Sequence, residues 1–268
     1  MIWIDGRLER HGRWHTAFNY LWGGLTSLGV ICVVFALWHE GSRAVGEFIL
    51  PAPLPVLERT RQILANYDAS EIGITLYRAA VGLGMAVSVG IGLGLLAGTS
   101  KTLALFFRPL ISLLLGMPPI IWVVLALFWF GLGDRATIFT ILISVIPLCF
   151  AASMRGMITV DAELEEMLDS FKVGFWAKVR HLYVPHLINY ILPSLTVAMG
   201  VGIKVTVMAE LLGSTEGMGS KIQESRAMLD TTETLAYVIV ILAVILIVEY
   251  LIIEPIRIFL MPWEEQRR

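Results

Sequence analysis

The sequence predicts an all-α polytopic membrane protein with six transmembrane helices. Of its 268 residues, 57% are hydrophobic and only 16% are charged, and the mean hydropathy is +0.76. A soluble domain of this length would need more charge to cover its surface. Several apolar runs also have the roughly 20 residues that one bilayer crossing requires. The polar segments between them are too short for a soluble domain, so residues 1–268 are expected to form one transmembrane domain.

The apolar runs define the expected crossings. They lie at about residues 18–38, 73–97, 103–132, 136–152, 187–212 and 235–253. The basic residues before the first run resemble a secretory signal, but no small-residue cleavage site follows, so we expect a retained membrane helix. After it, the prolines of LPAPLP (50–55) predict an extended or turning chain, and a short amphipathic helix should begin behind them.

Small residues recur every fourth position along the second run. They are Gly82, Ala86, Gly90, Gly94 and Gly98. A stripe of this kind lets another membrane helix approach closely. The GTSKT sequence at 98–102 looks like part of a phosphate-binding loop, but the full GxxxxGK[ST] spacing is absent, so no nucleotide site is predicted.

The third run is interrupted by Gly116, Met117, Pro118 and Pro119. Prolines inside a membrane helix remove backbone hydrogen bonds, which is tolerated where neighbouring helices or a water-filled cavity satisfy the freed carbonyls. The break is therefore either a kink that lines a pathway or a purely structural bend. Met117 and Trp122 flank it, either as packing residues or as part of a pathway lining.

Lys204 is a charge within the fifth run, where it costs at least a few kcal/mol on insertion scales. We expect it to face the protein interior or water and to be paired. It either attracts an anionic solute, forms a gate with Glu210 or an acid of a second protomer, or makes a fixed ion pair or snorkels. Glu210 itself either makes an interhelical hydrogen bond or contacts solute, and Arg78 is expected to be an anchor near the outer interface.

The distribution of lysine and arginine predicts the orientation. The expected inner face holds Arg7, Arg10, Arg13, Lys101, Arg108, Arg155, Lys172, Lys178, Arg180, Arg257, Arg267 and Arg268. The outer face holds Arg43, Arg59, Arg61, Arg135, Lys221 and Arg226. Twelve against six favours both termini in the cytoplasm,. The polar segment 161–185 then also lies there.

That segment, DAELEEMLDSFKVGFWAKVRHLYVP, is rich in charge and separates two very apolar runs. Its apolar residues fall at helical spacings: Leu164, Met167, Leu168, Phe171, Phe175 and Trp176. Charged residues stand between them, so the pattern predicts one or two short amphipathic helices against a surface. An ordinary solvated helix would show the same periodicity.

Other classes of protein find less support. The net charge of −2 gives no argument for a nucleic-acid partner. Cys32 and Cys149 sit alone in apolar stretches, as small hydrophobic residues do, and no metal site is predicted. An intramembrane enzyme would need a motif such as HExxH or GxSxG, which is absent. An ion-coupled secondary transporter or channel remains the alternative, although it usually needs intramembrane acids and paired broken helices.

Segment 161–185 resembles the EAA loop of membrane subunits of bacterial ABC importers. Aligned on Pro185, that pattern places its Glu on Glu166 and its Gly on Lys172; Gly174 could supply the flexible position instead. Three further stretches resemble the nitrate, sulfonate and taurine importer branch. They are LPAPLPVLERTRQIL, RPLISLLLGMPPIIWVVLALFWFGLG and MAELLGSTEGMGSKIQES.

The resemblance implies a type I ABC importer-like fold with a cytoplasmic coupling helix, in a bacterial inner membrane. Two copies would form the pathway within membrane lipid. Two cytoplasmic ATPases would bind ATP and magnesium, and a periplasmic or lipid-anchored receptor would deliver the solute. The chain itself would hold no cofactor and no catalytic residue. Relatives move small anions and also neutral vitamin precursors, and Lys204 favours an anion.

Two sets of residues carry these expectations. Coupling to the ATPase is expected of Glu166, Phe171, Lys172, Gly174, Phe175, Trp176 and Pro185. The pathway set is Met117, Pro118, Pro119, Trp122, Lys204 and Glu210.

Overall fold

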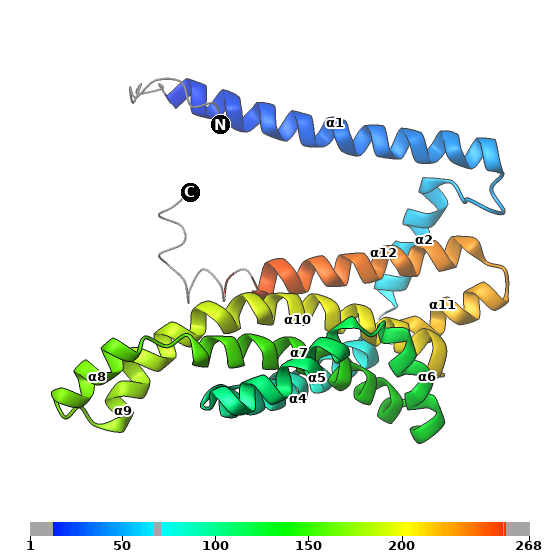
Figure 1. Ribbon diagram of the computed structural model, residues 1–268. Helices are drawn as coiled ribbons and strands as arrows, with labels where there is room; N and C mark the ends of the chain where they lie inside the picture. Colours follow the sequence, from blue (N-terminus) through cyan, green and yellow to red (C-terminus); the bar gives the residue numbers. More distant parts are fainter. Residues whose placement is uncertain (1–12, 67–70, 254, 256–268) are drawn as a thin grey trace. The chain divides into compact units, whose positions relative to one another are not determined.

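The computed structural model describes residues 13–66, 71–253 and 255, with side chains from residue 29 onward except at 252 and 253. Every regular element in this part is helical (Figure 1). The elements are α1 (Arg13–Val45), α2 (Pro53–Ala65), α4 (Ile72–Gly98), α5 (Lys101–Gly116), α6 (Pro119–Phe130), α7 (Asp134–Ile158), α8 (Ala162–Ser170), α9 (Phe175–Lys178), the π-helix η1 (Val179–Tyr183), α10 (Val184–Gly213), α11 (Met218–Ala227), α12 (Thr231–Val248) and the π-helix η2 (Glu249–Ile253).

The chain divides into two compact units, residues 1–58 and 59–268. In the first, the indole nitrogen of Trp38 donates a hydrogen bond to the carbonyl oxygen of Pro51 at 3.0 Å, which ties the end of α1 to the following turn. The expectation that the whole proline cluster stays outside the helix was wrong, because α2 begins at Pro53 and includes Pro55. Proline is tolerated in the first turn, where its missing N–H has no helical partner anyway.

The prediction of six separate crossings is not exact. Within the described residues, four helical segments are long and apolar enough to span a membrane, or five if one bent pair counts as a span. The four are Ile72–Gly98, Asp134–Ile158, Phe175–Gly213 and Thr231–Leu251, and they confirm four of the predicted runs. The first predicted run lies in α1, whose first half has no described side chains.

The third predicted crossing is two helices, α5 and α6, bent by 93°. At the break, Met117 and Pro118 are both extended, with ψ of 128° and 134°. Each precedes a proline, and the proline ring excludes the helical conformation from the residue before it. Pro119 then starts α6. Two consecutive prolines therefore convert the predicted kink into a sharp corner.

α4 packs along α7, as the stripe of small residues predicted. A Cβ atom built on Gly82 would lie 2.8 Å from Ile141, and one on Gly90 would lie 2.8 Å from the carbonyl oxygen of Ile146. Such distances leave no room for a side chain. The predicted close helix approach is confirmed, and α7 is the partner.

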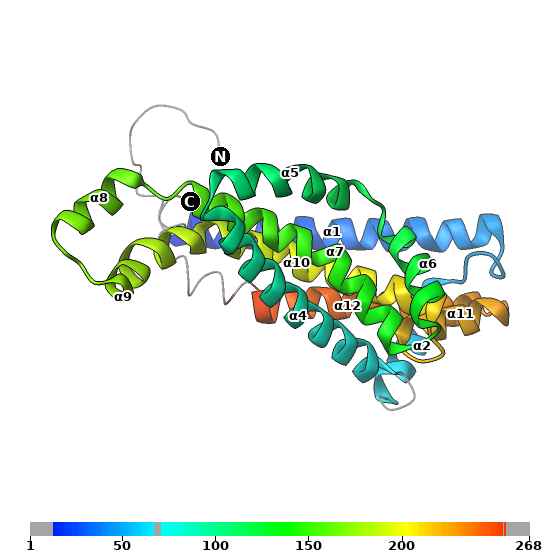
Figure 2. The same cartoon turned by 60° about the horizontal axis from the view of Figure 1, so that its bottom comes forward.

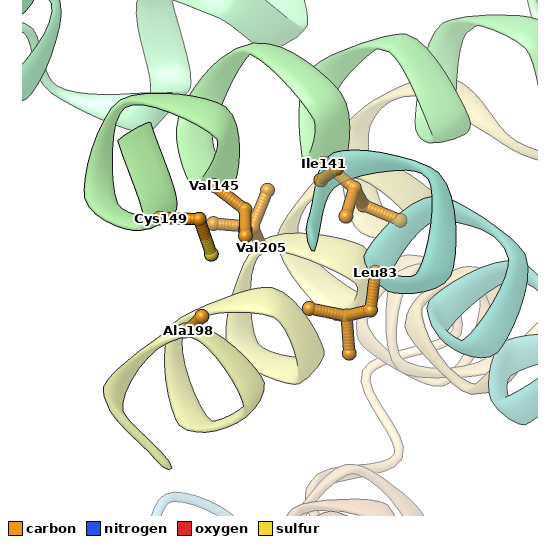
Figure 3. Close-up of a cluster of buried hydrophobic side chains, with 7 residues drawn as sticks. Leu83, Ile141, Val145, Cys149, Ala198 and Val205 are labelled. Carbon is orange, nitrogen blue, oxygen red and sulfur yellow. The ribbon is translucent and has the colours of Figure 1, made fainter. Parts of the chain in front are cut away.

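α10 completes the core of the second unit. A cluster of buried side chains joins α4, α7 and α10 (Figure 3). It includes Leu83 of α4 and Cys149 of α7, and Cys149 packs there as a small apolar residue. Gly202 gives Leu83 its space. α8 and α9 lie beyond one end of α7 and α10, whereas α6 and α11 lie at the opposite end (Figures 1 and 2).

Candidate functional site

The segment predicted to couple to an ATPase forms a helical hairpin at one end of the second unit. α8 begins at Asp161, whose carboxylate accepts hydrogen bonds from the backbone N–H groups of Glu163 and Leu164. This N-cap satisfies donors that the first turn would leave free. The hydroxyl of Tyr183, in η1, donates to Glu165 at 2.7 Å, and Lys178 pairs with Asp169. These contacts hold α8 against the following helix.

α8 ends at Ser170, and Lys172, which follows the C-cap residue Phe171, adopts a left-handed conformation with φ of 56°. The N–H of Val173 bonds to the carbonyl of Leu168 and the N–H of Lys172 to that of Asp169. This is the Schellman arrangement, in which glycine is the usual residue at the left-handed position. Gly174 is extended, with φ of −64°, so the suggestion that Gly174 supplies the flexible position was wrong.

Three aromatic side chains of the hairpin face away from the protein. Phe171, Phe175 and Trp176 are 76%, 69% and 80% exposed. The rings of Phe175 and Trp176 pack edge to face with centroids 5.8 Å apart. Glu166 is also exposed, and Pro185 follows η1 in the first turn of α10. Exposed aromatic clusters beside charged residues are typical of surfaces that receive a partner protein.

The predicted segment 161–185 is not wholly separate from the membrane helices. α9, η1 and α10 follow one another without a break from Phe175 to Gly213. The part of the segment from Phe175 to Pro185 is therefore the start of a spanning helix. A force applied to the aromatic residues at this helix start acts directly on a helix that belongs to the core.

At the opposite end, Arg78 of α4 is buried and 1% exposed. Its guanidinium donates to the carboxylates of Asp134, at 2.7 Å, and Glu210, at 3.1 Å. It also donates to the hydroxyl of Ser214 at 3.1 Å and to the carbonyl oxygen of Glu216 at 2.7 Å. One side chain thus connects α4, α7, α10 and the turn that follows α10.

Glu210 is fully buried within the same network. Its carboxylate accepts hydrogen bonds from the hydroxyl of Thr75 at 2.7 Å and from the backbone N–H of Gly219 at 3.2 Å, besides those of Arg78. A buried carboxylate with several donors is satisfied and held in one position. The interhelical hydrogen-bonding alternative for Glu210 is therefore the one the geometry supports.

Glu71 and Lys221 extend this network towards the surface. Glu71 accepts a hydrogen bond from the N–H of Gly217, and its carboxylate lies 3.7 Å from the ammonium of Lys221. Lys221 also donates to Glu224 at 3.0 Å, and this hydrogen bond raises the pKa of Lys221. We refer to the contacts of Glu71, Thr75, Arg78, Asp134, Glu210, Ser214, Glu216 and Lys221 as the Arg78 network.

The sequence did not predict the role of Arg78, which was expected to be an interfacial anchor. A signal was present, because Arg78 lies four residues before Gly82 and continues the stripe of residues that face α7 and α10. A charged residue on such a stripe must be buried and paired. Its carboxylate partners could not be read from the sequence, since they come from two distant segments.

Lys204 and Glu210 lie on different faces of α10: Lys204 is exposed, whereas Glu210 is buried. Within the described part of the chain Lys204 makes no ion pair, and Glu210 is bonded to Arg78 instead, so the alternatives for Lys204, a solute contact or a gate with an acid of a second protomer among them, stay predictions. Val197, two turns earlier, is 54% exposed on the same side. This face of α10 is left open for solvent, lipid or a second chain.

The residues of the α5–α6 break stand at an open edge. Pro118 is exposed, and Met117, Pro119 and Trp122 are half-buried. The indole N–H of Trp122 is buried without a hydrogen-bond acceptor. Across the described residues, no group of three or more His, Cys, Asp or Glu side chains could hold a metal ion.

Comparison with solved structures gives the same fold. A crystal structure of an amino acid ABC transporter with histidines matches 76% of this chain and 96% of its own, with a TM-score of 0.55 and 18% identity. The inward facing MetNI methionine ABC transporter matches 70% of this chain and 92% of its own, with a TM-score of 0.54 and 14% identity.

Curated relatives match over most of the length. The putative aliphatic sulfonates transport permease protein SsuC of Bacillus subtilis is 25% identical over 82% of this chain and 80% of its own. The taurine transport system permease protein TauC of Escherichia coli is 26% identical over 88% and 89%. The nitrate import permease protein NrtB of Synechococcus elongatus is 26% identical over 71% and 73%.

The family model for binding-protein-dependent transport system inner membrane components matches residues 90–253, which is more than half of the chain. The matched region includes the α5–α6 corner, the α8–α9 hairpin and, of the Arg78 network, the residues from Asp134 onward. The helical architecture, the long apolar helices and these matches lead to one conclusion: the chain belongs to the family of inner membrane components of binding-protein-dependent transport systems.

Proposed function

We propose that this chain is the membrane-spanning subunit of an ATP-driven importer and forms, as a homodimer, the pathway for a small anion. The solute would be of the sulfonate, taurine or nitrate kind that the relatives' names give. An extracytoplasmic binding protein would deliver it, and a separate ATPase chain would hydrolyse ATP. Both termini and the α8–α9 hairpin would lie in the cytoplasm.

The observation that carries the proposal is the α8–α9 hairpin. Its aromatic side chains Phe171, Phe175 and Trp176 are largely exposed, yet the backbone beneath them is fixed by the Asp161 cap and the Lys172 turn. A rigid helix end with exposed aromatic anchors suits docking into a groove of another protein. Because α9 continues into α10, closure of that partner would rock a core helix as a rigid body.

A homodimer is supported by the open face of α10. Lys204 costs free energy if it faces lipid, and within the described residues it has no carboxylate partner. A second copy would place two such lysines around a common axis, where an anion would find a positive lining. This is the physical reason for preferring an anionic solute.

The alternative, an ion-coupled secondary transporter, receives less support. Its proton or sodium coupling would need a membrane acid that is free to change its charge. Glu210 is the buried acid of the core, and it is held by Arg78, Thr75 and Gly219. A carboxylate held by these donors stabilises the packing of the helices and is not free to change its charge.

The test is reconstitution. The chain is co-purified with the ATPase encoded beside it and placed in liposomes, with the neighbouring solute receptor added outside. Receptor loaded with taurine, an alkanesulfonate or nitrate should raise ATP hydrolysis and drive uptake of that solute. Uptake that follows an ion gradient without ATP would instead support the secondary-transporter alternative.

A further inference from the structure

A groove of about 610 Å³ lies between α5 and α7, away from the Arg78 network. It is lined by one face of each helix, since its residues recur at three- and four-residue spacings on both,. Its volume falls in the range of small-molecule sites, about 300–1,000 Å³. None of its residues has a role in the proposed coupling or pathway sets.

Three cationic side chains line this groove: Lys101, Arg108 and Arg155. Lys101 and Arg108 are two turns apart on α5, and Arg155 lies in the last turn of α7. All three are exposed, and in the described part of the chain none has a carboxylate within ion-pair distance. Lys101 shares an adjoining cavity with Glu165, but that carboxylate is bonded to Tyr183.

The rest of the groove is apolar. Ile111 and Met154 are buried in its wall, and Leu115 is 43% exposed at its far end. Lys101 and Leu115 are fourteen residues apart on α5, which corresponds to about 21 Å at 1.5 Å per residue,. The groove is therefore cationic towards the α8 end of the unit and apolar over the remainder.

This division matches one chemical class of ligand. Arginine binds oxyanions through two parallel N–H groups, and several uncompensated cations at the edge of a membrane helix pair attract a counterion. The apolar wall suits an alkyl chain that continues from the anionic head. Basic pockets between membrane helices on the cytoplasmic side are known to take lipid head groups.

We infer that the α5–α7 groove binds an oxyanion that carries an aliphatic chain, with Arg108 and Arg155 at its head and the apolar wall along its tail. The head is the phosphate of an anionic phospholipid or the sulfonate of an alkanesulfonate. The site depends on the chain lying in a membrane, which its family establishes. It does not depend on which solute is transported, so it stands apart from the proposed function.

The experiment measures retention on the full-length purified chain by native mass spectrometry. The protein is incubated with mixed vesicles of phosphatidylcholine and phosphatidylglycerol, or with hexanesulfonate alone, and the bound molecules are counted after detergent release. Arg108→Gln and Arg155→Gln are compared with Arg135→Gln, an exposed arginine at the other end of α7. Ser112→Phe fills the groove without changing its charge.

Selective retention of phosphatidylglycerol should fall about fivefold in Arg108→Gln and in Arg155→Gln, which is the usual scale for a basic residue at an anionic membrane surface. It should stay unchanged in Arg135→Gln. Ser112→Phe should lower it as well. If hexanesulfonate alone is retained and shows the same dependence on the variants, the groove also takes the free anion. Equal retention of both lipids, or retention that the groove variants leave unchanged, would overturn the inference.

Discussion

Arg78 and Glu210 form an ion pair of 3.1 Å in which the two side chains are 2% and 0% exposed. The pair joins α4 to the last turn of α10, and its hydrogen bonds also reach Thr75, Asp134 and the turn before α11. A fully hydrogen-bonded pair of this kind fixes the relative position of the helices that it connects. The end of the unit opposite α8 and α9 is thereby closed around one arginine.

Removing either partner of this pair should destabilise the folded protein. Arg78→Gln leaves the buried carboxylate of Glu210 without a cationic partner, so it should lower the free energy of unfolding by about 3–5 kcal/mol. Glu210→Gln should lower it by less, because Arg78 keeps its ion pair with Asp134. Thermal unfolding of the purified variants measures this. Arg59→Gln is the control, because the Arg59–Glu233 pair is partly exposed, with side chains 42% and 23% exposed, and should contribute about 0–1 kcal/mol. Equal effects at both pairs would contradict the structural role of Arg78.

Two glycines of α4 distinguish the effect of helix packing on stability from the effect of helix propensity. Gly90→Ala should destabilise by about 1–3 kcal/mol, because its Cβ would lie 2.8 Å from both Cys149 and the backbone of Ile146,. Gly92 has no atom within 4 Å of the same position, so Gly92→Ala should stabilise the helix by up to about 1 kcal/mol. Opposite shifts in the melting temperature are expected. Shifts of the same sign would argue against close packing of α4 on α7.

The left-handed conformation of Lys172 predicts that substitutions at Lys172 and Gly174 affect stability differently. Lys172→Gly should stabilise the end of α8 by about 1 kcal/mol, since a side chain costs roughly that much in this conformation. Gly174→Ala should have little effect, because Gly174 is extended and has open space around its Cβ position. Hydrogen exchange of the backbone amides at 168–173 reports both. Greater protection of these amides in Gly174→Ala than in Lys172→Gly would refute the left-handed conformation of Lys172.

The exposed aromatic residues predict a binding defect without a folding defect. Trp176→Ala and Phe175→Ala should weaken association with the ATPase, each by about 2 kcal/mol or more if the residue is an interface anchor. Unfolding temperatures should stay unchanged, because the rings are exposed in the isolated chain. Glu166→Ala should reduce solute-stimulated ATP hydrolysis. Met228→Ala, exposed at the other end, is the control, and normal association of all these variants would exclude this hairpin as the contact.

Lys204 provides the test of an anionic pathway. Lys204→Met should abolish anion uptake in reconstituted liposomes and leave assembly and basal ATP hydrolysis intact, whereas Lys204→Arg should retain uptake because it keeps the charge. The exposed position of Lys204 means that no internal ion pair is lost in either variant. Full uptake by the methionine variant would show that this charge has no part in transport.

Local patterns in the sequence predicted much of the fold. Apolar length predicted the four spanning segments, because a bilayer crossing is set by composition and length alone. The four-residue spacing of small residues from Gly82 to Gly98 predicted a helix surface that another helix can approach closely, and the amphipathic pattern after Asp161 predicted α8. The predicted roles of the coupling and pathway residues stay predictions, since they concern partners that a single chain does not contain.

The sequence by itself determined the apolar helices, their close-packing stripe and the exposed aromatic hairpin, because each depends on residues that are neighbours along one helix. The tertiary structure decided that Arg78 pairs with Asp134 and Glu210, that Lys204 stays outside this network, and that α5 and α6 meet at 93°. These features depend on where distant segments converge and on how the chain turns at two prolines. Only the packing of α4, α7 and α10 brings the charges together, because an ion pair at membrane depth forms where helices place its members within a few ångströms.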